Sequence, residues 1–397
     1  MRFAPIRTIA VLLAAIVFAA GLSACSERVV YTGAFSAVNI EKKMNFVEAE
    51  DRGVWGNRAD RMQSFMQENV MGENYIFNNV YPLTKASDNS AFHYWIQAQM
   101  VDSITDAYIR TGDLNYAQQA KDLILAVRKK NSNHLTNDFY DDMGWMACAM
   151  AKLYDATGDE DLWNDLLLLY EVIMDSWHYN GGIAWSKDTM HYRNSPANGP
   201  ACILACRLYS ITGEQKYLDM ALQIFEWWDA TLIDHESGLV WDGLNREGDQ
   251  KIDKNWKFTY CQGVYIGSCV ELYKLLNDST YLDKALLTAD YTLGNLIDKK
   301  SGVLQEEGGG DGGAFKGIFC RYLVTLIKAT EQNRQKYVDF LVMNAETMWS
   351  NIPSEEEPIC NKNWSNKGKK PVELQVLTSG VALLESVASL DIGGYIS

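Results

Sequence analysis

A helix–turn–helix segment recurs along this sequence and limits the folds that the chain can adopt. Its four copies read AYIRTGDLNYAQQA, KLYDATGDEDLWNDL, RLYSITGEQKYLDMA and ELYKLLNDSTYLDKA, at residues 107–120, 152–166, 207–221 and 271–285. Three copies turn at Thr-Gly, where glycine readily takes the left-handed conformation that ends a helix. An acidic residue follows the turn and favours the next helix N-terminus. The repeat therefore predicts a series of helical hairpins.

The helical period dominates the rest of the chain, and no comparable set of alternating strands is present. We predict twelve helices, at about residues 40–68, 90–112, 114–129, 141–157, 159–177, 197–213, 214–231, 259–277, 279–298, 315–331, 333–350 and 371–389. Short turns alternate with long connections, which cover about 69–89, 130–140, 178–196, 232–258, 299–314 and 351–370.

The helices on the two sides of each short turn differ in composition. Those that follow a long loop carry small and apolar residues, as in MGWMACAMAKLY, and their partners are amphipathic, as in EQKYLDMALQIFEWW. An inner ring buried on all sides and an outer ring half exposed produce this contrast. Six such hairpins close into a double ring, so the predicted fold class is all-α, an (α/α)6 barrel. Helix 40–68 would be the outer partner of 371–389. An open superhelix of helical repeats is the alternative.

The first 24 residues have the pattern of an export signal. Arg2 and Arg7 precede the apolar run IAVLLAAIVFAAGL, and the segment Leu22-Ser23-Ala24-Cys25 resembles a bacterial lipobox. We therefore expect residues 1–24 to be a lipoprotein signal peptide and Cys25 to carry a lipid. Residues 25–38 would be a tether, and 39–397 a single catalytic domain. We expect an exported bacterial lipoprotein at the outer membrane, on the cell surface or the periplasmic face. Its contact with the membrane would be through the lipid alone.

Charge and cysteine usage exclude several classes of function. The formal charge is −15, and removal of the signal peptide would leave 34 basic and 51 acidic residues, a charge of −17. Such a chain repels nucleic acid, so no nucleic-acid partner is expected. Seven cysteines remain after Cys25, without the spacing of a disulfide framework. Cys202 and Cys206 share a helix face, but no histidine and cysteine cluster completes a metal site. We expect no metal, no cofactor and a monomer.

In the predicted barrel, all long loops lie at the end where the inner helices begin. A cleft there would be lined by helix N-termini, with their free N–H groups and positive dipole ends. Asp141 and Asp142 begin one inner helix and diverge by about 100° around it. Two carboxyls roughly 5–5.5 Å apart can cleave a glycosidic bond with retention, one as nucleophile and the other as acid and base. Acidic residues also occur at helix starts for stability alone, which is the alternative for this pair.

Other polar and aromatic residues lie at the same end of the predicted barrel. Aromatic faces stack on sugar rings, and amide and charged groups bind hydroxyls. The glycine-rich loop 308–313 lacks the spacing of a phosphate-binding loop and would be a flexible rim. The expected substrate-binding residues are Tyr140, Trp95, Trp185, Asn198, Tyr260, Gln262, Asp311, Phe315 and Lys316.

The segment FYDDMGWMA, residues 139–147, resembles the catalytic segment of glycoside hydrolase family 76. Further matches are GGIAW at 181–185, TYCQG at 259–263 and FKGIFCRYL at 315–323. The resemblance runs in order over about residues 40–390. It differs from the family's usual Tyr-Asn-Gln-Gly at Cys261, where a thiol replaces an amide and bears on subsite preference. Members of this family are endo-acting α-1,6-mannanases with an (α/α)6 fold and a retaining mechanism.

The resemblance implies that the chain hydrolyses α-mannan, with Asp141 as the nucleophile and Asp142 as the acid and base. Two other readings remain open from the residues alone. A helical, aromatic-rich lipoprotein could capture glycans without cleaving them, although it would not need two adjacent acids at a cleft. The same barrel also hosts inverting glycosidases and polysaccharide lyases, because a fold does not determine a function.

Overall fold

The structure is a computed structural model that describes residues 52–177 and 180–396. These residues form twelve α-helices, and their four strands are two residues long. Cys25, the signal peptide, the tether and the start of the first predicted helix lie outside the described residues. The domain boundaries given above therefore stay predictions.

The inner ring consists of the helices that follow the long loops. Each inner helix packs against the next one along the chain, and the last packs against the first, which closes the ring. Its members are α3 (Tyr94–Thr111), α5 (Tyr140–Thr157), α7 (Ser195–Thr212), α9 (Thr259–Leu276), α11 (Gly312–Ala329) and α13 (Leu374–Ile392).

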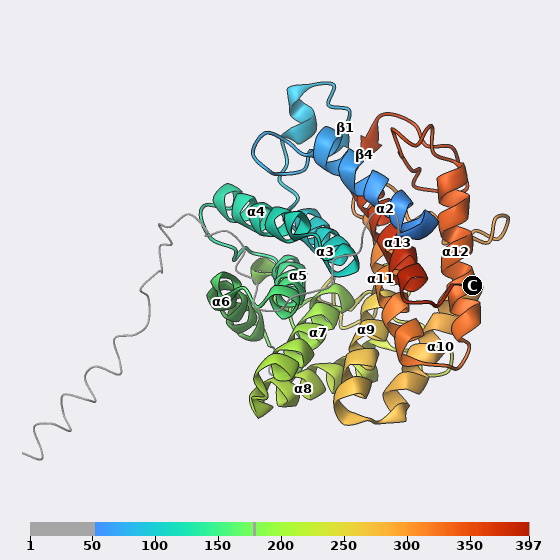
Figure 1. Ribbon diagram of the computed structural model, residues 1–397. Coiled ribbons are helices and arrows are strands. Elements are labelled where there is room, and N and C mark those ends of the chain that lie inside the picture. Colours follow the sequence, from blue (N-terminus) through green and yellow to red (C-terminus); the bar gives the residue numbers. More distant parts are fainter. Residues whose placement is uncertain (1–51, 178–179, 397) are drawn as a thin grey trace, which may run out of the picture. The chain divides into compact units, whose positions relative to one another are not determined.

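The outer ring consists of the hairpin partners, which Figure 1 shows at the periphery. Helices α4, α6, α8 and α10 pack against the inner helices that precede them, and α12 packs against α11 and α13. The first described helix, α2, packs against the last one, α13, so the blue and red helices lie side by side (Figure 1). The predicted (α/α)6 barrel and its closure are confirmed. The bounds are α2 (Gly53–Phe65), α4 (Leu114–Lys130), α6 (Trp163–Met174), α8 (Gln215–Leu232), α10 (Ser279–Asn295) and α12 (Arg334–Ser350).

The repeated Thr-Gly-Asp sequence builds the short turns as expected. At the end of α3, Gly112 has φ +70° and donates its N–H to Tyr108 O at 2.7 Å. Thr111 Oγ1 accepts from the N–H of Asp113 at 3.1 Å, and the Asp113 carboxylate caps α4 by accepting from Asn115 N at 2.9 Å. The same Thr–Gly–Asp contacts recur at 157–159. Three consecutive residues, Thr-Gly-Asp, therefore end one helix and cap the start of the next.

Burial separates the two rings in the predicted way. Every residue of α7 from Ser195 to Cys206 is buried, whereas α8 buries a stripe that includes Tyr217, Ala221, Ile224 and Trp228. By length and composition α13 could cross a membrane, but most of it is buried inside the ring. The inner helices approach closely at glycines. For example, a Cβ on Gly263 would lie 2.8 Å from Phe319 Cα, so a larger residue there would push α9 and α11 apart.

Short strands and turns fix the long loops at the end where the inner helices begin. Strand β1 (Val80–Tyr81) pairs with β4 (Val372–Glu373), and β2 (Arg193–Asn194) pairs with β3 (Gly243–Leu244), both antiparallel. A π-helical turn at Met66–Val70 follows α2, and 3₁₀ turns lie at Ala86–Asn89 and Lys187–Thr189. A third 3₁₀ turn, Glu160–Leu162, lies at the other end of the barrel, in the short connection between α5 and α6.

Several predicted helix boundaries were wrong by a few residues. Helix α3 begins at Tyr94 rather than 90, and residues 372–373 belong to β4 rather than to α13. Helix α11 begins three residues early, at Gly312 rather than Phe315. The glycines permit this because a Cβ on Gly312 would lie 2.0 Å from Glu307 O. The end of the glycine-rich loop is thus packed helix, and not the flexible rim expected from its composition.

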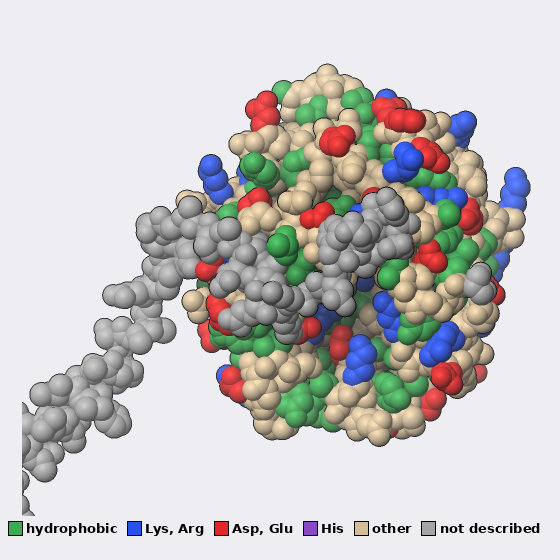
Figure 2. Space-filling view, viewed as in Figure 1, with side chains coloured by type: hydrophobic (Ala, Val, Ile, Leu, Met, Phe, Trp, Pro, Cys, Tyr) green, Lys and Arg blue, Asp and Glu red, His purple; other side chains and the backbone are tan. Residues whose placement is uncertain are grey.

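The surface shows mixed charge. On the face drawn in Figure 2, Asp and Glu side chains of the described residues are interspersed with Lys and Arg rather than gathered into one patch.

Candidate active site

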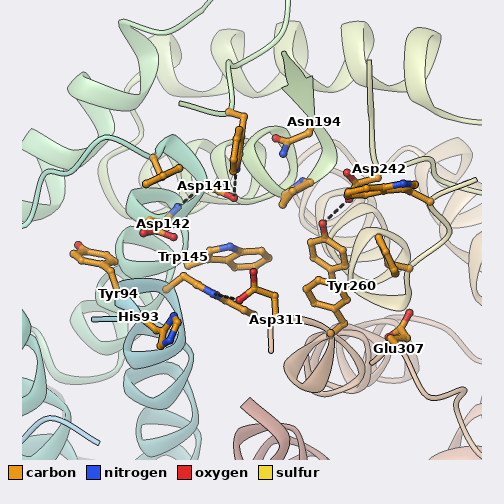
Figure 3. A pocket seen from close by; sticks show the side chains of 18 of the residues that line it. His93, Tyr94, Asp141, Asp142, Trp145, Asn194, Asp242, Tyr260, Glu307 and Asp311 are labelled. Atoms are coloured by element: carbon orange, nitrogen blue, oxygen red, sulfur yellow. Dashed lines mark hydrogen bonds between the residues drawn. The ribbon is translucent and has the colours of Figure 1, made fainter. Parts of the chain in front are cut away.

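A cleft of about 640 Å³ opens where the inner helices begin. Residues from the first turns of α3, α5, α7, α9 and α11 line it, together with the long loops before them. Asp141 and Asp142 lie on one side and Asp242 and Tyr260 on the other, with Trp145 between them (Figure 3). The cleft thus forms at the place predicted from the alternation of short and long loops.

The two adjacent aspartates have different hydrogen-bond partners. Asp141 accepts two N–H groups, from Trp185 Nε1 at 3.0 Å and from the backbone of Asp142 at 3.0 Å. Asp142 accepts from Asn137 Nδ2 at 2.9 Å. Because donors stabilise the charged form of a carboxyl, Asp141 is better stabilised as a carboxylate than Asp142.

Burial in the cleft raises the pKa of both carboxyls. The pKa of Asp141 rises to about 7 because burial disfavours its charge, against the opposing effect of its two donors. Burial also raises the pKa of Asp142 well above its usual range, and the neighbouring Asp141 charge raises it further. At neutral pH the pair therefore holds a proton on Asp142, while Asp141 is partly ionised.

The loop before α7 positions this pair. Trp185 O accepts from Tyr140 N at 2.9 Å, which joins the loop to the start of α5. The Trp185 ring lies between Phe139, with ring centroids 5.3 Å apart, and Tyr192, at 5.9 Å. Its indole N–H is thereby aimed at Asp141 before any ligand binds.

A buried carboxylate on the opposite wall organises a second group of residues. Asp242 is 2% exposed and accepts from Tyr260 OH at 2.5 Å, Tyr192 OH at 2.8 Å and Arg246 Nη2 at 2.9 Å. Cys261, the residue that differs from the family pattern, lies with Sγ 3.6 Å from Asp242 Oδ1. Burial raises the pKa of Asp242 although these donors oppose the change.

Two further carboxylates line the cleft near α9 and α11. Asp311 accepts from Trp95 Nε1 at 3.0 Å. Glu307 accepts from the N–H of Thr259 at 2.7 Å and from its hydroxyl, so it caps the start of α9. Burial raises the pKa of Glu307 to about 7, while the Lys316 charge opposes the change. The walls therefore carry several carboxyl groups and fewer cationic groups that could bind an anionic polymer.

Most of the predicted site residues meet in this cleft. Asp141, Asp142 and five of the predicted substrate-binding residues line it; the five are Trp95, Trp185, Tyr260, Asp311 and Phe315.

Four predicted substrate-binding residues lie behind the cleft wall, which corrects that expectation. Asn198 and Gln262 are fully buried and hold the backbones of Ile183 and Val240. Lys316 is buried and donates to Lys362 O at 2.6 Å, with its Nζ 4.1 Å from the centroid of the Trp364 ring. Tyr140 is buried at the start of α5, with its backbone rather than its ring joined to Trp185. These four residues support the walls instead.

Sequence reasoning missed most of the cleft residues that lie on loops. Their positions depend on how the loops fold back, although a signal was available in the acidic and aromatic residues inside the long connections. The missed lining residues in these connections include Phe139, Tyr192, Asn194, Asp242, Arg246, Trp256, Phe258 and Glu307. Trp145, on α5, was missed as well. Within residues 52–177 and 180–396, no group of three His, Cys, Asp or Glu side chains is arranged to hold a metal ion.

Known proteins resemble this chain over nearly all of the barrel. Residues 57–392 match glycosyl hydrolase family 76. The structure of the Lin0763 protein from Listeria innocua has a TM-score of 0.81 and 36% identity, and the match covers 85% of this chain and 98% of that one. The GH76A α-1,6-mannanase from Salegentibacter sp. HEL1_6 has a TM-score of 0.80 and 35% identity over 85% of this chain and 99% of that one.

An inactive variant of that mannanase, with two consecutive aspartates replaced by asparagine, has been solved with α-1,6-mannotriose. The mannan endo-1,6-alpha-mannosidase DCW1 of Eremothecium gossypii is 22% identical over 74% of this chain and 71% of its own length. The chain spans 63% of a Schizosaccharomyces pombe relative, to which it is 25% identical over 282 residues. By its profile match, its relatives and its closed helical ring, the chain belongs to glycosyl hydrolase family 76.

Proposed function

We propose that this protein is a retaining, endo-acting hydrolase of α-1,6-linked mannan, with Asp141 as the nucleophile and Asp142 as the acid and base. The observation that carries the proposal is the unequal environment of two adjacent carboxyls in one cleft. Asp141 receives two N–H donors, and Asp142 receives one and retains its proton at higher pH. A retaining glycosidase needs this division between an ionised and a protonated carboxyl.

In the first step, the Asp141 carboxylate attacks the anomeric carbon of a mannose unit. The bond from that carbon to the glycosidic oxygen breaks, and the Asp142 proton moves to the departing oxygen. The product of this step is a glycosyl ester on Asp141 together with the released sugar hydroxyl. Trp185 keeps the attacking carboxylate ionised and oriented, because its N–H is bonded to Asp141 Oδ2.

In the second step, Asp142 acts as a base. Its carboxylate takes a proton from a water molecule while the water oxygen attacks the anomeric carbon, and the ester bond to Asp141 breaks. Two inversions at one carbon give overall retention of configuration. Both aspartates then return to their starting protonation states.

The relatives support the substrate. The Salegentibacter enzyme and the Eremothecium protein are named for α-1,6-linked mannan, and the inactive Salegentibacter variant lacks two consecutive aspartates. In this chain two aspartates are adjacent at one place, Asp141-Asp142. The acidic and aromatic walls of the cleft suit a neutral sugar polymer better than an anionic one.

Single replacements of the two aspartates test the roles. Asp141→Asn and Asp142→Asn should each lower kcat on α-1,6-mannan by at least about a thousandfold. The matched control is Asp138→Asn, since Asp138 is a near neighbour whose side chain is 73% exposed outside the cleft. NMR of the first product should show the α-anomer. Hydrolysis by Asp141→Asn at the wild-type rate, or a β-anomer as first product, contradicts the proposal.

We also propose that the enzyme is exported and anchored through a lipid on Cys25. The support is the segment Leu22–Cys25 after a short apolar run, which has the pattern of a lipoprotein cleavage site. Cys25→Ala should abolish incorporation of labelled fatty acid and move the protein from the membrane fraction to the soluble fraction. Membrane association that is unchanged in this variant would refute the anchor.

A further inference from the structure

Trp256 is an exposed aromatic residue on the cleft wall. It lines the cleft and is 43% exposed, and the other tryptophans of the described residues are less exposed. Exposure of an apolar indole face to water is unfavourable. A tryptophan that serves packing alone is therefore mostly covered by other side chains. Phe258 and Tyr260, two and four residues further along the chain, also line the cleft, and Tyr260 is buried. The stretch 256–260 therefore runs from the rim of the cleft toward its interior.

Arg246 holds the Trp256 ring in place. Its guanidinium carbon lies 3.8 Å from the centroid of the Trp256 ring and 4.3 Å from that of Tyr192. Arg246 is itself anchored, with Nη2 bonded to Asp242 at 2.9 Å and Nε to Asp253 at 3.0 Å. The backbone N–H of Trp256 donates to Asp253 O at 2.9 Å, which fixes the main chain that carries the ring. The ring is thus oriented before a ligand arrives, which lowers the entropy lost on binding.

The hairpin that carries these residues is fixed to the rest of the wall. Strand β3 pairs with β2, and Leu244 forms a bridge with Ile252 on the return strand. Asn245 Nδ2 donates to His191 O at 3.0 Å, which joins the hairpin to the loop before α7. The same loop carries Trp185, the partner of Asp141. The platform formed by Trp256 and Arg246 is therefore joined to the catalytic pair through the loop before α7.

Aromatic rings connect the platform with the middle of the cleft. The Trp256 and Phe258 ring centroids are 5.8 Å apart, Phe258 and Phe315 are 5.1 Å apart, and Phe315 and Trp95 are 6.3 Å apart. Arg246 ties Trp256 to Asp242, which lies across the cleft from Asp142 (Figure 3). Trp256 is consequently at one end of this aromatic row, on the side of the cleft that carries Asp242.

We propose that Trp256 and Arg246 form a subsite that binds one neutral hexopyranose unit of the substrate chain, on the side of the cleft opposite the catalytic pair. The apolar face of the sugar stacks on the indole. Arg246 Nη1 makes no hydrogen bond within the described part of the chain, and it can donate to a sugar hydroxyl beside the ring. The identity of the polymer rests on the proposed function, whereas the stacking site rests on the geometry of Trp256 and Arg246.

The test is a length series of oligosaccharides titrated by calorimetry into the Asp141→Asn protein, which cannot turn them over. The panel contains α-1,6-manno-, α-1,6-gluco- and α-1,4-gluco-oligosaccharides of two to eight units. With Trp256 intact, affinity should rise by about tenfold at the length that first reaches the platform. Trp256→Ala in the same background should remove this increment, and Trp256→Phe should keep most of it.

Tyr75→Ala is the matched control, because Tyr75 is an aromatic residue that is 59% exposed and lies outside the cleft lining. It should leave the length dependence unchanged. The subsite is refuted if no series shows an increment that depends on Trp256, or if Trp256→Ala weakens every length equally. Hydrolysis of the same panel by the wild-type protein tests the proposed function separately. A rise in affinity that depends on Trp256 but occurs with a glycan other than α-1,6-mannan, together with no hydrolysis of mannan, would support the subsite and reject the proposed function.

Discussion

Asn198 holds Ile183 by both of its backbone groups. Its Oδ1 accepts from Ile183 N at 2.8 Å, and its Nδ2 donates to Ile183 O at 3.0 Å. Ile183 lies two residues before Trp185, whose indole N–H is bonded to Asp141. A fully buried amide on α7 thus determines the course of the loop that orients the proposed nucleophile on α5.

The same clamp occurs at the fourth residue of two other inner helices. On α3, Gln97 exchanges two hydrogen bonds of 3.0 Å with the backbone of Phe77. On α9, Gln262 accepts from Val240 N at 2.9 Å and donates to Val240 O at 2.8 Å. A carboxamide suits this position because it offers an acceptor and a donor side by side. These inner helices therefore fix the long loops that precede them.

Breaking the Asn198 clamp should change both stability and catalysis. Asn198→Ala leaves buried backbone groups of Ile183 without partners, so the free energy of unfolding should fall by about 1–3 kcal/mol. Trp185 would then hold Asp141 less well, so the acid limb of the pH profile of kcat/KM should move to higher pH. Denaturant unfolding and rate profiles measure the two effects.

Gln97→Ala is the matched control for this prediction. It breaks the same kind of clamp, but on the loop before α3, which carries neither Trp185 nor Asn137, the side-chain donors to the two aspartates. It should lower the free energy of unfolding by a similar amount and leave the limbs of the pH profile in place. Equal shifts of the acid limb in the two variants would mean that the clamps act through general stability alone.

These clamps explain why part of the site was mispredicted from the sequence. An amide in the first turn of an inner helix faces either the cleft or the preceding loop, and local sequence does not distinguish the two. Asn198 and Gln262 were therefore expected to bind sugar, but they bind backbone. Lys316 was misplaced for a related reason, because its position depends on Trp364 and Lys362 in a distant segment.

The ring and the catalytic pair were predictable because they depend on local patterns. The Thr-Gly-Asp turns, the composition of the inner helices and the position of Asp141 and Asp142 at a helix start are all readable within about twenty residues. Asp242, Arg246 and Trp256 were not, since the hairpin that brings them to the cleft is held by pairing between β2 and β3, which are about fifty residues apart. Long-range pairing of this kind leaves no periodic signal in the sequence.

Replacing the Trp185 indole should move the acid limb of the rate profile. Its N–H stabilises the ionised form of Asp141, so Trp185→Phe should raise the Asp141 pKa further above its usual range. Since the nucleophile must be ionised, the acid limb of kcat/KM should shift upward by about one pH unit. Trp163→Phe, on the outer helix α6, should not move it. A shift to lower pH, or none, would contradict the role of this hydrogen bond.

Loss of the Asn137 donor should affect the other limb. Asn137 Nδ2 lowers the pKa of Asp142 against the larger effects of burial and of the Asp141 charge. Asn137→Ala removes that donor, so the alkaline limb, where Asp142 loses the proton it must donate, should move to higher pH. Asn137→Asp should act in the same direction, because it adds a like charge while keeping an acceptor for Phe139 N. Movement of the acid limb instead would reverse the roles assigned to the two aspartates.

The proposed acid should also make the folded protein less stable at neutral pH. An aspartate in the unfolded chain loses its proton near pH 4, whereas Asp142 keeps its proton to much higher pH because burial and the Asp141 charge raise its pKa. The folded state therefore binds more protons than the unfolded state above pH 4, and stability falls as the pH rises through this window.

Asp142→Asn removes the titration while keeping the shape. The variant should be more stable than the wild type at pH 7 by at least about 1 kcal/mol, and the difference should shrink toward pH 4. Urea unfolding at four pH values between 4 and 7 measures this, with Asp138→Asn as the exposed control that should follow the wild type. A gap that is constant, or that widens toward pH 4, would mean that Asp142 is ionised in the folded protein and cannot be the proton donor.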